Sequence, residues 1–354
     1  MSSPSLNIAA IQQEIEGGYI SAQRHPDAPL RILNYTSRTQ HQWRWNPETT
    51  KCRGLIVDED WQVVQRPFEK FFGLEQLREM GRTIPSEPFE SYEKLDGSLG
   101  ILYHIDSHAA IALRGSFTSR GAQRATAIYR KKYGHIKVDK SLTYLFEIID
   151  PTHRIVVDYG QQEDLILLAV IETSTGKEIS PLPDIGFPVV KQYHGFKQVE
   201  DLVASEEPNR EGYVLRFSSG MRVKIKFEEY KRIHRLVTGL TAKAVWDLLR
   251  EGKDSSDVIG NLIVPNDFLD WVTKIESDLR QAFNSIESYC KTNLEVLQQQ
   301  APDNESRKEL AARIWQTAYP SVVFAMLDQK NYSDKVWGLI RPQHSRQVFR
   351  RGGE

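Results

Sequence analysis

The sequence predicts an α+β protein in which antiparallel sheets with flanking helices are followed by an all-helical C-terminal region. Two observations support this fold class. From about residue 30 to residue 227, apolar residues occur in short runs rich in Val, Ile, Leu, Phe and Tyr, separated by turn-forming residues, which is typical of strands. From about residue 228 onward, apolar residues recur every three or four positions, which is typical of amphipathic helices.

The expected strands are short, and several of them pair as hairpins. Residues 213–217 and 221–227 flank Ser218, Ser219 and Gly220, a turn-forming triplet that indicates an antiparallel hairpin. Repeated runs of this kind favour a largely antiparallel sheet system. The other runs that we interpret as strands are residues 53–60, 61–68, 99–105, 111–115, 143–150, 154–159 and 164–172.

One long amphipathic helix is expected in the C-terminal region. Apolar residues recur at helical spacing from Phe268 to Leu297, and Pro265 and Asn266 precede them as start signals. We therefore predict a separate all-helical domain in this part of the chain. Shorter helices are expected at residues 242–250, 307–319, 322–330 and 335–341.

Length and composition fit two folded domains, which we place at residues 1–238 and 239–354. The 354 residues, 40% hydrophobic and 26% charged, lie in the range of ordinary globular proteins. The formal net charge of −1 means that any nucleic-acid contact has to come from a local patch of Lys and Arg.

The sequence favours a cytoplasmic protein. Cys52 and Cys290 lie far apart, which gives neither a disulfide framework nor the spacing of a zinc site. Residues 1–20 lack a basic segment followed by an apolar run, and no long uncharged apolar stretch follows. We expect an intracellular protein without a membrane segment, and no obligate protein partner is indicated.

Lys94 lies at a position suited to a nucleophile. It ends an expected strand in SYEKLDGSLGILY, and the turn signal Asp96-Gly97 separates it from the next strand. This arrangement presents an amine on a rigid edge. Because the K-x-D-G pattern is short, a solvated lysine beside a hairpin turn is the alternative interpretation.

Further motifs support the nucleophile. The K-x-D-G segment resembles the nucleotidyl-acceptor motif of the covalent nucleotidyltransferases, which include RNA ligases, DNA ligases and capping enzymes. The segments RPFEKFF and FEIIDPTHRIVVDY look most like the family of phage T4 RNA ligase 1, and the resemblance covers about residues 50–230. The other motifs of the superfamily occur in the expected order: Arg53-Gly54, Lys70, Phe72, Arg114-Gly115-Ser116, Glu147, Glu211-Gly212, Lys224 and Lys226.

The resemblance implies that residues 1–238 form an adenylyltransferase domain, in which ATP is the nucleotide and AMP is carried on Lys94. Phe72 is expected to pack within the nucleotide site, and a place in the core is the alternative. The other implied nucleotide-binding residues are Arg53 and Lys70 at the β- and γ-phosphates, Arg114 at the ribose, and Glu93, Glu147, Glu211, Lys224 and Lys226.

Two carboxylates are candidate metal ligands. Glu147 lies in a run that is otherwise nearly all apolar, and a glutamate is rarely buried without a partner. The resemblance implies a role at the ribose or at a hydrated metal for Glu147, and at a metal for Glu211, while an ion pair with a neighbouring Arg or Lys is the alternative for each. Mg²⁺ or Mn²⁺ is expected, because Mg²⁺ takes few protein ligands and usually bridges phosphates.

A lysine amine attacks phosphorus only when it is neutral. With an unperturbed pKa near 10.4, only about one lysine in a thousand is neutral near pH 7.4. We expect Lys224, Lys226, Arg53 and a metal ion to lower the pKa of Lys94. Lys224 and Lys226 alternate with apolar residues, so they share one strand face and are suited to hold an α-phosphate. A solubilising strand edge is the alternative.

The resemblance implies a reaction in three steps. AMP passes from ATP to Lys94, then to an RNA 5′-phosphate, and a 3′-hydroxyl finally attacks that activated end and releases AMP. The expected substrate is RNA with 5′-phosphate and 3′-OH ends, with RNA repair as the role, cleaved tRNA as one candidate and a phage or a bacterium as one possible source. The alternatives are an inactive nucleotidyltransferase-fold RNA-binding protein, or a DNA ligase or capping-type enzyme.

The helical C-terminal region favours an RNA ligase, because DNA ligases and capping enzymes of the superfamily usually carry a β-rich OB fold there. RNA substrate choice is its expected role. The chain ends in a basic tail that is a candidate for phosphate contact, and a solvated terminus is the alternative. The arginines of this tail are Arg341, Arg346, Arg350 and Arg351.

Overall fold

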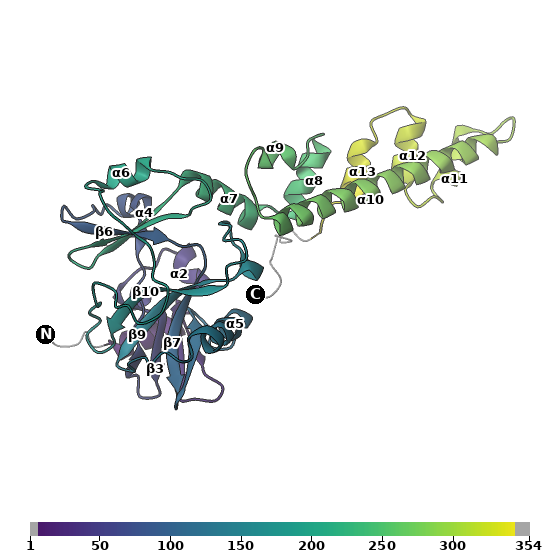
Figure 1. Ribbon diagram of the computed structural model, residues 1–354. Coiled ribbons are helices and arrows are strands. Elements are labelled where there is room, and N and C mark those ends of the chain that lie inside the picture. The colour runs from purple at the N-terminus through teal and green to yellow at the C-terminus, as the bar shows by residue number, and fades with distance from the viewer. Residues whose placement is uncertain (1–5, 344–354) are drawn as a thin grey trace. The chain divides into compact units, whose positions relative to one another are not determined.

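The computed structural model describes residues 6–343 and divides the chain into two compact units, with the boundary between Lys231 and Arg232 (Figure 1). Every strand of the described residues lies in the first unit, and the second unit is helical. The predicted fold class is confirmed. The domain division after residue 238, and a role of the second domain in RNA choice, stay predictions.

The first sheet is an antiparallel meander in the order β1-β2-β3-β4. Ile32 and Leu33 on β2 point to opposite faces, as successive strand residues do. Leu33 packs with Ile11 of the first helix, whereas Ile32 packs against the second sheet. The elements here are α1 (Ile8–Glu16), β1 (Ile20–Arg24), β2 (Leu30–Tyr35), α2 (Ser37–His41), α3 (Pro47–Lys51), β3 (Arg53–Asp58) and β4 (Val63–Gln65).

The second sheet, in the order β10-β9-β7-β8, is antiparallel and stacks on the first. On β9, Leu145 faces the first sheet, while Phe146 faces a core that α5 covers on the other side. The elements are β7 (Ser98–Ile105), β8 (His108–Leu113), α5 (Arg120–Ile128), the π-helix η1 (Tyr129–Tyr133), β9 (Leu142–Ile149), the 3₁₀-helix η2 (Pro151–His153) and β10 (Asp164–Glu172).

The third sheet has the order β11-β6-β12-β13-β5. It is antiparallel except for the pairing of β13 with β5, and it contains the predicted hairpin as β12 and β13. Apolar residues of this hairpin, among them Tyr213 and Val223, fill one face. The elements are β5 (Phe72–Gly73), α4 (Leu74–Glu79), β6 (Phe89–Lys94), β11 (Gln192–Tyr193), α6 (Val199–Ala204), β12 (Gly212–Phe217) and β13 (Arg222–Lys226).

The second unit is built around one long helix, as expected. Ile286 and Cys290 of α10 pack with Ile314, Val322 and Val336 of the shorter helices. No helix within residues 6–343 is both long and apolar enough to cross a membrane. The helices are α7 (Glu228–Gly239), which crosses the unit boundary, α8 (Ala242–Arg250), α9 (Ser256–Ile259), α10 (Asn266–Gln299), α11 (Arg307–Ile314), α12 (Pro320–Leu327) and α13 (Ser333–Leu339).

One expected strand is wrong. Residues 154–159 follow η2 as an irregular segment instead of pairing in a sheet. The backbone N–H groups of Val156 and Val157 donate to the Asp96 carboxylate, at 2.7 and 2.9 Å. A buried side chain thus provides the hydrogen bonds that a neighbouring strand would have supplied, which an apolar sequence pattern alone does not reveal.

Candidate active site

The third sheet brings the predicted lysines together on one face. In the antiparallel register, Lys94 on β6 lies opposite Gly212 on β12, which in turn lies opposite Lys226 on β13. Residues that are paired across neighbouring strands point to the same face of a sheet, and so do residues two apart on one strand. Lys224 therefore lies on the same face as Lys94 and Lys226. The β12–β13 hairpin therefore sets the spacing between the predicted nucleophile and the two cations.

Glu211 connects two of these lysines. Its Oε2 lies 2.8 Å from Lys94 Nζ, its Oε1 lies 2.8 Å from Lys226 Nζ, and its side chain is only 3% exposed. Gly212 has a φ of +139°, and a Cβ there would come within 2.0 Å of the Ile225 carbonyl oxygen. Only glycine fits this backbone conformation, and the conformation directs Glu211 inward between the two ammonium groups.

The pKa of Lys94 is raised, which corrects the expectation from the sequence. Burial alone would lower this pKa, but the carboxylates of Glu211 and Glu147 outweigh burial. For Glu211, burial alone would raise the pKa, but Lys94 and Lys226 outweigh it and lower the pKa. Lys94 is therefore held as an ammonium ion without ATP. The expectation counted nearby cations and missed the carboxylate that contacts the amine.

The lysines with lowered pKa values are Lys224 and Lys70. Burial and nearby cations, Lys70 first among them, lower the pKa of Lys224 to about 6. Burial and the charge of Arg53 lower the pKa of Lys70 to about 8. An anion relieves such crowding of partly desolvated cations, so this group is suited to hold phosphate. We call Arg53, Lys70 and Lys224 the cation group.

Aromatic rings surround the Lys70 end of the cation group. The Lys70 ammonium nitrogen lies 4.7 Å from the ring centroid of Phe72 and 5.2 Å from that of Trp45. The two rings contact each other with centroids 5.6 Å apart, and Phe72 is 5% exposed. Phe72 is thus both a buried residue and a neighbour of the cation group, so the two interpretations offered from the sequence are compatible.

Arg53 and Arg114 meet at Tyr35. Arg114 Nη1 donates to the Tyr35 hydroxyl at 2.6 Å, and the Arg53 side chain also bonds to that tyrosine. The Nη1 atom of Arg53 is buried and has no hydrogen-bond partner among residues 6–343. Buried donors are normally paired, so a free donor in a group of cations is expected where a phosphate oxygen binds.

Glu147 lies on β9 close to Glu211 and Lys94. Its carboxylate accepts a hydrogen bond from the Gly97 N–H at 2.9 Å. Burial raises the pKa of Glu147 to about 7, and Glu211 adds to this rise while Lys94 opposes it. Two carboxylates are therefore close enough to repel each other, as is common where a cation binds between them.

These two carboxylates fit a metal that is shared with phosphate. No group of three or more His, Cys, Asp and Glu side chains within residues 6–343 is arranged to hold a metal alone. Mg²⁺ needs only one or two carboxylates when waters and phosphates complete its shell. Glu147 and Glu211 can meet that requirement, provided that Glu211 exchanges a lysine contact for the metal.

Glu93 is a predicted site residue that points away from the lysines, to the opposite face of the third sheet. It lies opposite Tyr213 in the register, whereas its neighbour Lys94 lies opposite Gly212. Successive strand residues point to opposite faces. The Glu93 carboxylate accordingly lies 3.8 Å from Arg210, whose guanidinium covers the Tyr213 ring.

Asp96 is a site residue whose structural role the sequence did not reveal. It is 6% exposed, and it accepts the two N–H groups of the irregular segment as well as the Tyr230 hydroxyl, at 2.6 Å. Its own N–H donates to the Tyr159 hydroxyl at 2.8 Å. This network fixes the turn after Lys94. The motif marked Asp96 as a turn former, and nothing in the pattern marked Tyr159 or Tyr230.

Tyr230→Phe is expected to destabilise the protein by about 1.5–3 kcal/mol, because it removes a hydrogen bond to a buried carboxylate. Urea denaturation measures this change. Tyr19→Phe is the matched control, since its hydroxyl donates to Gln42 at 2.9 Å on the surface. Equal losses of stability in the two variants would show that the Asp96 network does not hold the turn.

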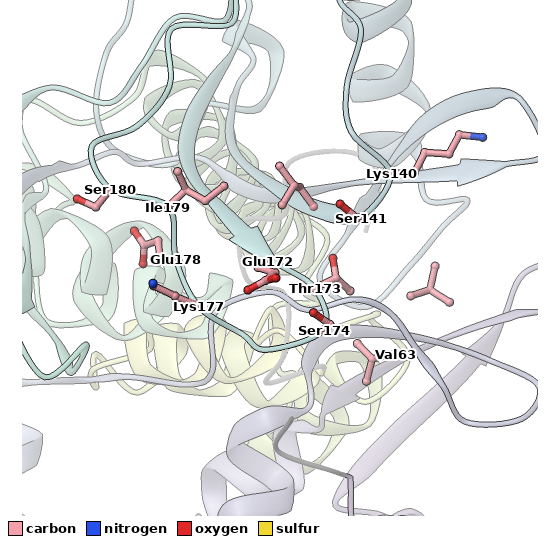
Figure 2. A pocket seen from close by; sticks show the side chains of 12 residues that line it. Val63, Lys140, Ser141, Glu172, Thr173, Ser174, Lys177, Glu178, Ile179 and Ser180 are labelled. Atoms are coloured by element: carbon pink, nitrogen blue, oxygen red, sulfur yellow. The ribbon is translucent and has the colours of Figure 1, made fainter. Parts of the chain in front are cut away.

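Figure 2 shows a pocket of about 770 Å³ that none of the predicted site residues lines. It lies where β9 begins, at Leu142, and includes Glu172, Thr173 and Lys177 at and beyond the end of β10. Another pocket, of about 450 Å³, does include Lys70 and Phe72. The Lys70 end of the cation group therefore borders open space that a ligand can enter, whereas the pocket in Figure 2 shares only Glu178 with that space.

Antiparallel sheets that bring a lysine, two carboxylates and several cations together have the arrangement expected of a nucleotidyltransferase-type enzyme. Residues 51–231 match the family described as RNA ligase, and the chain belongs to this family. The recognition made from the motifs is confirmed: the protein is an RNA ligase, and RNA is its substrate.

The chain is also similar to individual proteins. The chain is 24% identical to an RNA ligase of Rhodothermus phage RM378 in an alignment 360 positions long, which covers 78% of this chain and 81% of the phage protein. Among solved structures, it is similar to the Naegleria gruberi RNA ligase with PPi, at 16% identity and a TM-score of 0.38, over 47% of this chain and 57% of that one. A variant of that ligase with ATP and Mn gives 18% identity and a TM-score of 0.35, over 46% of this chain and 54% of that one.

Proposed function

We propose that the protein joins RNA 3′-OH and 5′-phosphate ends with ATP, through AMP bound covalently to Lys94. The observation that carries this proposal is the alignment of Lys94, Glu211 and Lys226 on one sheet face beside the cation group. Lys94 supplies the nucleophile, and the cations supply the charge that phosphoryl transfer requires.

In the first step the Lys94 nitrogen, after releasing a proton to solvent, bonds to the α-phosphorus of ATP, and the bond to pyrophosphate breaks. Lys224 and Lys226 hold the α-phosphate, Lys70 holds the departing phosphates, and Arg53 Nη1 donates to one of their oxygens. Arg114 orients the ribose. A divalent metal ion held by Glu147 and Glu211 supplies further positive charge at the phosphate oxygens when it is bound.

In the second step an oxygen of the RNA 5′-phosphate bonds to the AMP phosphorus while the bond to Lys94 breaks, and the amine takes up a proton. In the third step a 3′-hydroxyl oxygen bonds to the phosphorus of the activated 5′ end, AMP leaves, and the hydroxyl proton is released to solvent. Repair of broken RNA, cleaved tRNA among its forms, is the proposed role, and a cytoplasmic location stays a prediction.

Incubation with α-labelled ATP and Mg²⁺ tests the proposal. The label is expected on the wild-type protein, on the peptide that contains Lys94, and it is expected to pass to 5′-phosphate RNA but not to DNA. Transfer to DNA instead would indicate a DNA ligase, and a preference for a 5′-diphosphate end with GTP would indicate a capping-type enzyme. Absence of any label would indicate an inactive RNA-binding protein.

A further inference from the structure

Trp43 is an exposed aromatic residue with a strained backbone. Its side chain is 43% exposed, and its φ is +55°, a conformation that bulky residues rarely adopt. Neither property favours folding, because a strained position suits glycine and an exposed position suits a polar residue. Strain of this kind gathers where a ligand is held, which makes the surroundings of Trp43 a candidate ligand site.

Trp43 is the outermost member of the aromatic group at Lys70. Its ring centroid lies 6.0 Å from that of Phe72 and 6.3 Å from that of Trp45, which are the two rings that the Lys70 ammonium covers. The indole N–H of Trp45 is buried and has no partner among residues 6–343. The aromatic group therefore extends from Lys70 of the cation group to the exposed ring of Trp43, and it includes the unpaired indole N–H of Trp45.

The stereochemistry of the proposed reaction determines the side of the site from which the RNA 5′ end approaches. Attacking and leaving groups lie in line in phosphoryl transfer. Pyrophosphate leaves opposite Lys94 in the first step, so in the second step the RNA 5′-phosphate must attack from the side that pyrophosphate left. In the strand order β6-β12-β13-β5, Lys94 ends β6, Lys224 lies on β13, and Lys70 precedes β5 by two residues, with Lys224 close enough to interact with both other lysines. The RNA 5′ end thus enters on the Lys70 side, beside Trp43.

We propose that Trp43 stacks on the 5′-terminal nucleobase of the RNA strand that receives AMP. This inference rests on the proposed function and adds a subsite to it. An unstacked base binds a flat aromatic ring with little dependence on its identity, because every base has a π-face. The subsite therefore requires that a base be present and tolerates any base, which suits an enzyme that joins broken ends of varied sequence.

A single-turnover experiment tests the subsite. Wild-type protein loaded with AMP is mixed, at subsaturating concentration, with 5′-phosphate RNA or with the same RNA lacking its 5′-terminal base. RNA-adenylate formation is expected to be at least about fivefold faster with the base present. Trp43→Gly removes the ring and adopts φ +55° without strain. It is expected to reduce this preference below about twofold, while Trp43→Phe keeps most of it.

Trp61→Gly is the matched control, since Trp61 also has a positive φ, of +62°, and lies against Arg31 on the first sheet. It is expected to keep the wild-type preference for the base. A wild-type protein without that preference, or a Trp43→Gly protein that retains it, would overturn the subsite. Failure of the proposed function gives a different result, because Lys94 then takes up no label before RNA is added.

Discussion

Lys94→Ala protein is expected to take up no label from α-labelled ATP and yet to seal RNA whose 5′ end already carries AMP. Removing the nucleophile eliminates the first two steps, and the rate of labelling should fall by roughly 10⁴-fold or more. The third step forms no bond to Lys94, so sealing of the activated RNA should stay within about tenfold of wild type.

Gel assays of labelled protein and of sealed RNA measure both quantities for Lys94→Ala. Lys177→Ala is the control, because Lys177 is an exposed lysine of the same unit and lines the pocket of Figure 2, which none of the predicted site residues lines. It should keep both activities. A label that survives Lys94→Ala would remove Lys94 from the reaction, and equal loss of both activities would mean that the variant damages the fold.

Glu211→Gln is expected to lower the free energy of unfolding by about 3–5 kcal/mol and to abolish most labelling of Lys94. The substitution leaves two partly buried ammonium groups without their shared carboxylate, and breaking a buried pair from one side has costs of this size. The control is Glu75→Gln, whose carboxylate is 68% exposed and pairs with Lys231 at 2.8 Å on the surface. An exposed pair of this kind contributes only about 0–1 kcal/mol.

The stability difference between wild type and Glu211→Gln is expected to depend on pH in a definite direction. The pKa of Glu211 is lowered in the folded protein, so its contribution is present above the unfolded pKa and is lost as pH falls through the folded pKa. Wild type and variant should therefore differ fully near pH 7 and converge in acid. Urea denaturation in EDTA across pH checks this expectation, and a difference that persists or grows in acid would contradict it.

Most of the correct predictions came from local sequence patterns, such as strand periodicity and short motifs. Alternation along 213–217 and 221–227 fixed a hairpin and the shared face of Lys224 and Lys226, because strand periodicity is a local property. The motif order selected the RNA ligase family. Contacts between distant segments were less accessible: the pairing of Lys94 with Glu211 depends on the register of two strands more than a hundred residues apart in the chain.

The predictions that proved wrong also depended on contacts between distant segments of the chain. Residues 154–159 have the composition of a strand, but their hydrogen bonds go to Asp96, some sixty residues away. The direction of the Lys94 pKa shift required knowing which carboxylate contacts the amine and not only which cations lie near. Arg341 is the only member of the predicted basic tail within the described residues; Arg346, Arg350 and Arg351 lie outside them.

The ion pair of Lys94 with Glu211 means that, in the protein without ATP, the nucleophile is a protonated ammonium group. An ammonium group has no lone pair to offer, so acyl phosphates and other electrophiles of the cell meet an unreactive side chain. Reactivity appears only when an incoming ligand draws Glu211 away and lets the amine lose its proton. The substrate thereby provides both the phosphorus that is attacked and the condition under which attack becomes possible.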